Sequence, residues 1–133
     1  RDRIAFARTH GYVRCLSGRI RYVGGLYSKD DRIREAAERI AFSTPIQESA
    51  QWILKQAEIR VWNEVILPLQ AAGCWIEPLL QVHDSLKLEM DDGLQFAVND
   101  LMQDCMTRVP HSFSVPLAVT GEWGPNMRDM EAF

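Results

Sequence analysis

The chain has 133 residues, of which 47% are hydrophobic and 25% are charged, as is usual for a soluble globular domain. This length suits one domain with a hydrophobic core but excludes a complete multidomain enzyme. No apolar run approaches the roughly 18 residues that a membrane helix needs, and no secretory signal opens the sequence, so we expect no membrane partner. Because the first residue is Arg1 and the sequence begins in a helical pattern, we expect a piece of a longer protein.

The net charge of −3 conceals a marked asymmetry along the chain. Residues 1–39 contain ten of the fifteen Lys and Arg and five of the eighteen acids, so this segment carries +5 and the remainder −8. Such a segment can bind phosphate, although a solvated basic face balanced by acids elsewhere is at least as common. The three cysteines are odd in number and far apart, which argues against disulfides and structural zinc and favours thiols in a reducing compartment.

The beginning of the chain predicts the end of a helix followed by a β-hairpin. Residues 1–10 have a helical pattern, and Gly11 is a typical helix terminator. Two β-prone runs, residues 12–16 and 19–23, flank the dipeptide Ser17-Gly18. A two-residue connection of this kind is characteristic of a hairpin.

The rest of the chain mixes helices and strands. Apolar residues at three- and four-residue spacing predict a helical region from 31 to 69. Pro45 lies in its middle, so either a second helix begins there or one long helix kinks. Another amphipathic helix is expected at 94–109 and a last strand at 114–123. Strands and helices in mixed order, with hairpins, indicate an α+β fold around an antiparallel sheet.

The stretch Leu79–Met90 predicts a second hairpin with a polar tip. Residues up to Val82 are mostly apolar, and Leu86–Met90 alternates apolar with charged residues, the pattern of a strand with one buried face. The tripeptide His83-Asp84-Ser85 separates the two runs. We expect the carboxylate at this tip to be rigid and partly desolvated, which is how proteins present oxygen ligands to divalent cations.

By itself, Asp84 does not establish a catalytic centre. Phosphoryl transfer with two metal ions needs at least two carboxylates, and this stretch places only one well, so an ordinary turn-forming aspartate is the more common alternative. A Ser–His–Asp relay is excluded because adjacent residues on an extended chain point to opposite faces.

A polar face is expected on the long helical region. Arg39, Ser43 and Gln47 are four residues apart, so their side chains share one side of a helix. An arginine, a hydroxyl and an amide in a row suit contacts to phosphates and to the minor groove of DNA. An exposed face with local ion pairs such as Glu35–Arg39 is the alternative.

These features occur in an order that resembles the family A DNA polymerases, the bacterial DNA polymerase I group. Gln81-Val82-His83-Asp84 and the Leu-x-Leu-Glu strand after it are similar to motif C of that family, and residues 34–47 are similar to the helix that precedes it. Gly11-Tyr12-Val13 and residues 18–23 resemble the hairpin after the fingers. The segment from Val115 to Trp123 resembles the closing strand, so the similarity spans nearly the whole chain.

The resemblance implies an antiparallel palm sheet whose motif-C hairpin packs on long helices. Residues 1–133 would form one C-terminal palm portion of a larger polymerase. Its parts would be a helix end and hairpin (1–30), a long kinked helical region (31–72), and the motif-C hairpin with a helix and the closing strand (73–133).

The resemblance also implies an activity: a DNA-directed DNA polymerase that uses two Mg²⁺ ions to add deoxynucleotides to a primer 3′ end in the cytoplasm of a bacterium or a virus-infected host. Asp84 would be a catalytic metal ligand, and His83 a catalytic residue that contacts DNA near the primer terminus. Arg39 and Ser43 would hold the template, and Gln47 would contact the minor groove.

The partners implied are primer–template DNA, dNTP and the N-terminal remainder of the polymerase. The other catalytic carboxylate and the nucleotide-binding helix would precede Arg1, so this chain alone should not polymerise.

Four residues depart from the family pattern: Ser85 replaces an acid, Ser43 an Asn, Glu48 a Gly and Trp52 an acid. The first three weaken the expected metal, template and DNA contacts. Ser85 and Glu48 support one alternative, a non-catalytic DNA-binding subunit or degenerate polymerase remnant, which would use the basic first third of the chain and the face from Arg39 to Gln47. A further alternative is a module that binds a polypeptide through exposed sheet edges.

Overall fold

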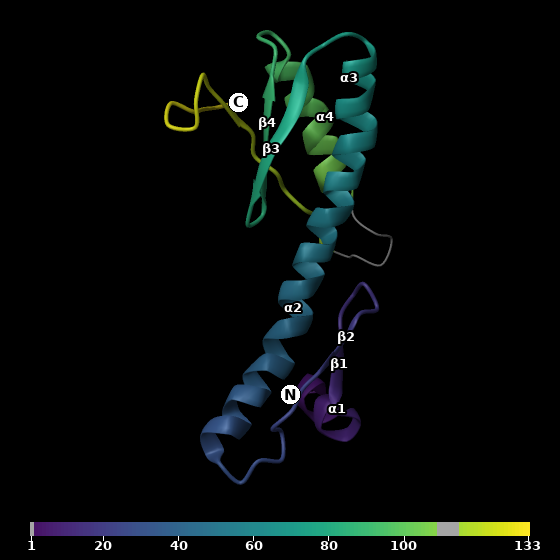
Figure 1. Ribbon diagram of the computed structural model, residues 1–133, viewed down its shortest axis with the longest axis vertical. Helices are drawn as coiled ribbons and strands as arrows, with labels where there is room; N and C mark the ends of the chain where they lie inside the picture. Colours follow the sequence, from purple (N-terminus) through teal and green to yellow (C-terminus); the bar gives the residue numbers. More distant parts are fainter. Residues whose placement is uncertain (1, 109–114) are drawn as a thin grey trace. The chain divides into compact units, whose positions relative to one another are not determined.

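The computed structural model describes residues 2–108 and 115–133 of the chain. It divides into two units, Arg1–Trp52 and Ile53–Phe133, which are described separately below. The long helix α2 begins in the first unit and ends in the second (Figure 1). None of the helices in the described residues is both long and apolar enough to cross a membrane.

The first unit consists of a short helix, a hairpin and the beginning of α2. Helix α1 (Asp2–His10) ends as predicted, since Gly11 has a φ of 75° and its N–H donates to the Ala7 carbonyl at 2.8 Å. Strands β1 (Tyr12–Arg14) and β2 (Ile20–Tyr22) form the predicted antiparallel hairpin, but residues 15–19 connect them, so the predicted two-residue turn at Ser17-Gly18 is wrong. A small apolar core joins these elements to α2, and its members are Ala7, Val13, Val23, Leu26, Ala37 and Ala41.

Helix α2 (Asp31–Val61) runs through Pro45 without interruption, so of the two alternatives the start of a second helix at Pro45 is excluded. A proline cannot donate a backbone hydrogen bond, but the helix formers on both sides preserve the helix. A π-helical turn, η1 (Trp62–Ile66), then leads into α3 (Leu67–Ala71). This wider turn immediately precedes Pro68, which has no N–H to donate to the previous turn.

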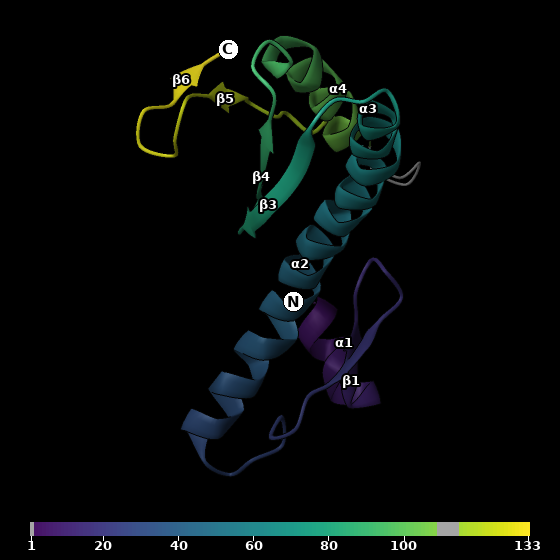
Figure 2. The same ribbon diagram turned by 45° about the horizontal axis from the view of Figure 1, so that its top comes forward.

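The second unit contains the other predicted hairpin, packed on helices. Strands β3 (Ile76–Val82) and β4 (Ser85–Met90) are antiparallel, with a register shift next to Pro78. Helix α4 (Gln95–Thr107) and the hairpin lie side by side in both ribbon views (Figures 1 and 2). Their shared core consists of Val61, Val65, Ile66, Ile76, Val98 and Cys105, with Leu86, Leu88 and Met90 of β4 against it. The expected α+β class, with a hairpin packed on long helices, is confirmed.

The last predicted strand is only marginally formed. Residues 115–121 form no strand, and only β5 (Glu122–Trp123) pairs, with β6 (Glu131–Ala132). Ser114, where the predicted strand begins, lies outside the described residues. Alternating side chains favour a strand but do not supply the neighbour that a β-ladder needs, and in the described residues no other strand pairs with this segment.

Candidate functional site

The tip of the β3–β4 hairpin is a two-residue turn made by His83 and Asp84. Val82 and Ser85 are the last paired residues on either side. His83 has a φ of 53°, and no other non-glycine residue in the described part of the chain has a positive φ. A positive φ at the first turn residue matches the twist of the flanking strands but is costly for a residue with a Cβ atom.

The carboxylate of Asp84 is exposed, so the expectation of a partly desolvated group is wrong for this chain. The strand residues that lead to it are also uncovered, with Leu79 48%, Leu80 41% and Val82 43% exposed. The reason is that, among residues 2–108 and 115–133, β3 pairs only with β4, and the apolar core lies toward the other end of the hairpin. Within the described residues, Asp84 makes no hydrogen bond or ion pair, which leaves both oxygens available to a ligand.

Three hydrogen bonds hold the backbone around the tip. The Ser85 hydroxyl donates to the Val82 carbonyl at 2.9 Å, and the Gln81 amide donates to the His83 carbonyl at 3.2 Å. The Lys55 ammonium, from α2, donates to the Gln81 side chain at 3.5 Å. Ser85, where the family has an acid, therefore uses its hydroxyl to fix the turn.

The donor set at the tip fits one ligand of a Mg²⁺ site, because an exposed carboxylate is the hard oxygen donor that this ion prefers. It is not a whole site, since no group of three or more His, Cys, Asp or Glu capable of holding a metal occurs in residues 2–108 and 115–133. The nearby acids are engaged elsewhere. Glu89 lies opposite Glu77 toward the other end of the hairpin, and the Asp91 carboxylate accepts the Trp75 N–H at 2.7 Å.

The predicted polar face lies on α2, within the first unit. Arg39 and Gln47 are exposed and Ser43 is half-buried. None of the three side chains has a hydrogen-bond or ion-pair partner among the described residues. The Glu35–Arg39 ion pair of the alternative interpretation does not form, so these groups are free to contact another molecule.

Sequence reasoning missed the contacts of the residues that follow Gln47. The Glu48 carboxylate forms an ion pair with Arg19 at 2.6 Å, and the Ser49 hydroxyl accepts the Leu16 N–H at 3.0 Å. Both contacts fix the turn of the β1–β2 hairpin to α2. Because 29 residues separate Arg19 from Glu48 and 33 separate Leu16 from Ser49, no local spacing could have revealed these contacts.

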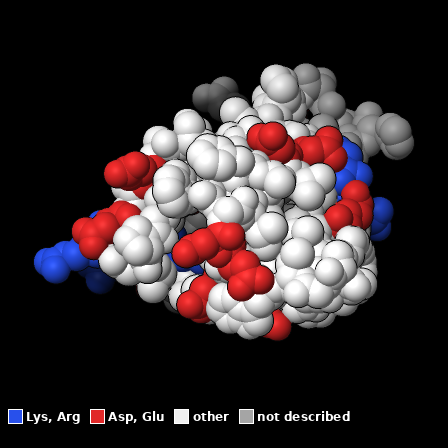
Figure 3. Space-filling model, turned by 90° about the horizontal axis from the view of Figure 1, so that it is seen from above, with Lys and Arg blue, Asp and Glu red and all other residues white. Residues whose placement is uncertain are grey.

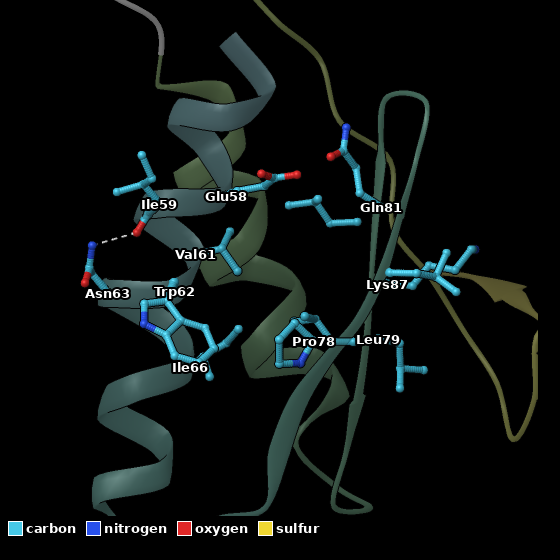
Figure 4. Close-up of a pocket in the computed structure, with 13 residues that line it drawn as sticks. Glu58, Ile59, Val61, Trp62, Asn63, Ile66, Pro78, Leu79, Gln81 and Lys87 are labelled. Atoms are coloured by element: carbon cyan, nitrogen blue, oxygen red, sulfur yellow. Dashed lines mark hydrogen bonds between the residues drawn. The ribbon is translucent and has the colours of Figure 1, made fainter. Parts of the chain in front are cut away.

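A second missed feature is an apolar groove in the second unit. It encloses about 400 Å³ between the end of α2 with η1 and the β3–β4 hairpin. Figure 4 shows Trp62 and Ile66 pointing toward Pro78 across this space. Trp62 is 42% exposed, so the groove presents a large apolar surface. Trp62, Asn63 and Ile66 of the π-helical turn line the groove, and no sequence pattern indicated that turn.

Charge is unevenly distributed over the surface. The face in Figure 3 carries scattered carboxylates, and Lys and Arg are visible only near its edges. This agrees with the net charge of −8 in residues 40–133. The basic side chains expected to meet phosphate belong mainly to the N-terminal segment.

Comparison with known proteins places this geometry in a family. The family model of DNA polymerase family A matches residues 1–129 of the chain. The chain belongs to DNA polymerase family A. It is 44% identical to DNA polymerase I of Deinococcus radiodurans over 126 residues, which cover 93% of this chain and 12% of that protein. DNA polymerase I of Chloroflexus aurantiacus is 38% identical over 96% of this chain and 13% of its own length.

A solved structure is similar in both sequence and fold. The polymerase domain of Pol1 from M. smegmatis, in complex with a DNA primer-template and dNTP, has a TM-score of 0.74 and 39% identity. The match covers 87% of this chain and 20% of that one. The chain thus spans about an eighth of the length of its curated family A relatives. The family expected from the motifs is confirmed.

Proposed function

We propose that the chain is the palm portion of a DNA-directed DNA polymerase, which extends a primer 3′ end with deoxynucleotides under the direction of a template. The observation that carries the proposal is the family A match over residues 1–129, which includes the hairpin that exposes Asp84. The similar M. smegmatis domain, solved with primer-template and dNTP, supports the same substrates.

The residue roles are those that the resemblance to the family implies, and side-chain chemistry supports them. The Gln47 amide can donate to the N3 and O2 acceptors that every base pair presents in the minor groove. Arg39 pairs with a template phosphate, and the Ser43 hydroxyl adds a shorter polar contact to the same strand. His83 lies beside the primer terminus, where its ring can donate a hydrogen bond to the DNA.

Asp84 contributes one ligand to a two-Mg²⁺ site whose other carboxylate belongs to polypeptide outside this chain. The metal ions would neutralise charge that develops on the phosphoryl oxygens. The contribution of this chain is to hold the carboxylate on a hairpin whose turn is fixed by Ser85 and Gln81.

We expect the rest of the polymerase to pack on the apolar groove and on residues 79–82, the uncovered half of β3. A two-stranded ribbon is marginal alone, and further strands or helices complete such a sheet. The groove between Trp62 and Pro78 supplies an apolar surface for that packing (Figure 4). This proposal also predicts that the chain alone does not extend primers.

The decisive experiment is primer extension by a chimera in which this chain replaces the matched segment of the D. radiodurans relative. With Mg²⁺ and dNTP, we expect extension by the chimera and none by the chain alone. Asp84→Ala should lower the rate by roughly 100-fold or more, because metal neutralisation contributes several kcal/mol. Asp92→Ala, an exposed aspartate with the same charge change, is the control and should stay within about two-fold of the parent.

Retention of activity within a few-fold by the Asp84→Ala chimera would contradict the proposed role. The Arg19–Glu48 ion pair and the local use of the Ser85 hydroxyl favour one second candidate, a non-catalytic DNA-binding remnant. That candidate predicts no extension by the chimera, and salt-dependent duplex binding that is indifferent to Mg²⁺ and to Asp84→Ala.

A further inference from the structure

The ion pair between Arg19 and Glu48 has two unequal partners. The Arg19 side chain is 77% exposed, whereas that of Glu48 is 27% exposed. The carboxylate is therefore fixed against the protein, and the guanidinium extends into solvent. A ligand can reach Arg19 without displacing any other part of the first unit.

Glu48 is an acid within a basic neighbourhood. Burial and the charge of Glu48 raise the pKa of the Cys15 thiol, and Arg19 and Arg21 act in the opposite direction. All three charged groups are thus within electrostatic reach of one buried sulfur atom. Arg21 has no acidic partner among the described residues, so Glu48 neutralises one of two neighbouring arginines.

The position of Glu48 links this pair to the polar face of α2. It directly follows Gln47, so a nucleic acid that contacts Gln47 also approaches the carboxylate. A phosphate that binds Arg19 must displace Glu48 from the guanidinium and then lies near a like charge. Exposed ion pairs are weak enough for such an exchange.

We propose that Glu48 is an internal counterion of Arg19 that competes with DNA phosphate and thereby sets the affinity and salt dependence of DNA binding. This inference rests on the DNA-binding function proposed above. Each arginine that pairs with phosphate steepens the dependence of log K on log [salt] by about 0.9. While Glu48 neutralises Arg19, this arginine contributes little to the number of phosphate contacts and therefore little to the salt dependence.

A purely structural role for the ion pair predicts the opposite result. If Glu48 served only to fix the hairpin to α2, its loss would loosen the hairpin and weaken DNA binding. The hydrogen bond between Ser49 and the Leu16 N–H remains in a Glu48 variant, and it keeps the turn on the helix. The direction of the change in affinity therefore separates the two roles.

The test measures the binding of a labelled primer–template duplex by fluorescence anisotropy, from 50 to 200 mM NaCl. The protein is the chimera described above, in which this chain replaces the matched segment of the D. radiodurans relative. Glu48→Gln should tighten binding roughly 3- to 10-fold at the lowest salt and steepen the salt slope by about 0.9. The matched control is Glu35→Gln, since Glu35 lies exposed on the same helix and has no partner among the described residues; it should change affinity less than about two-fold.

A double-mutant cycle completes the test. Arg19→Gln should have little effect in the parent and should abolish the gain in the Glu48→Gln background. If the protein binds DNA and Glu48→Gln and Glu35→Gln change its affinity equally, the inference about Glu48 is overturned and the proposed function is not. Weaker binding by Glu48→Gln would also overturn it, in favour of the structural role. A lack of DNA binding by every variant would overturn both this inference and the proposed function.

Discussion

His83 combines backbone strain with a place beside the exposed carboxylate at the tip of the hairpin. Its φ of 53° lies in a region that a side chain with a Cβ disfavours by roughly 1–2 kcal/mol. Its ring makes no hydrogen bond in the described part of the chain that would repay this cost. The Gln81 amide and the Ser85 hydroxyl hold the turn in this conformation. Backbone strain of this kind is concentrated at functional sites, which supports a role for the imidazole in ligand contact.

This strain can be measured by comparing two substitutions of His83. His83→Gly relieves the positive φ and His83→Ala does not, whereas both remove the ring. The free energy of unfolding of the glycine variant should exceed that of the alanine variant by about 1 kcal/mol, after allowance for the greater chain entropy of unfolded glycine. Urea denaturation of the 133-residue chain gives both values. Equal stabilities would show that the turn relaxes and that the positive φ carries no strain.

The stability and activity of these variants should move in different directions. If the imidazole contacts the primer terminus, both substitutions lower the extension rate of the chimera, although one of them stabilises the hairpin. Full activity of the glycine variant would remove His83 from the proposed site.

At the scale of elements, the features that could be predicted are those that depend on residues close together in the sequence. The two hairpins and α4 follow from local spacing, and the family was identified by the resemblance of its motifs. Three features depend on partners outside the local pattern: the covering of the hairpin tip, the pairing of residues 115–121, and the Arg19–Glu48 contact. A covered hairpin tip and a paired last strand were both predicted from alternating side chains. Alternation describes the direction of the side chains but does not show whether a neighbouring strand or helix is present.

Pro45 shows the same limit within a helix. The sequence allowed a new helix or a kink, and the continuous α2 shows that the surrounding helix formers outweigh one lost hydrogen bond. The π-helical turn before Pro68 had no sequence signal, and it positions Trp62 at the groove.

The end of α4 is held by side chains from the neighbouring helical segment. The Arg60 guanidinium donates to the backbone carbonyls of Cys105 at 2.8 Å and Arg108 at 2.7 Å. Arg108 in turn pairs with Glu64, and this hydrogen bond raises the pKa of the guanidinium above its already high value. Cations at a helix C-terminus satisfy its free carbonyls and its dipole.

We therefore expect Arg60→Ala to destabilise the chain by about 1–2 kcal/mol, because two charged hydrogen bonds to α4 are lost. Arg128→Ala removes the same charge from an exposed residue whose side chain has no partner among the described residues, so it should change stability by less than about 0.5 kcal/mol. Thermal unfolding followed by circular dichroism measures both. Equal effects of the two substitutions would show that the contacts of Arg60 contribute nothing beyond its charge.

At the scale of the whole molecule, charge is segregated along the chain. The N-terminal segment is basic, and the remainder is acidic and carries the groove and the uncovered half of β3. An open strand with Leu79, Leu80 and Val82 exposed is a template for pairing with another chain. In a complete family A polymerase we propose that the rest of the polypeptide fills this role, so the 133-residue chain alone should self-associate through it.

Leu80→Lys tests this expectation, because Leu80 lines the groove and lies outside the apolar core. A lysine on an open strand opposes edge pairing by its charge, so sedimentation velocity should show less association than in the parent at the same concentration. Leu101→Lys is the matched control, since Leu101 is 43% exposed against 41% for Leu80, lies on α4 and does not line the groove. If both lysines reduce association equally, net charge is the cause and the groove has no special role. If only Leu80→Lys does so, the same substitution in the chimera should lower extension activity, because the surface that self-associates is the one that the rest of the polymerase needs.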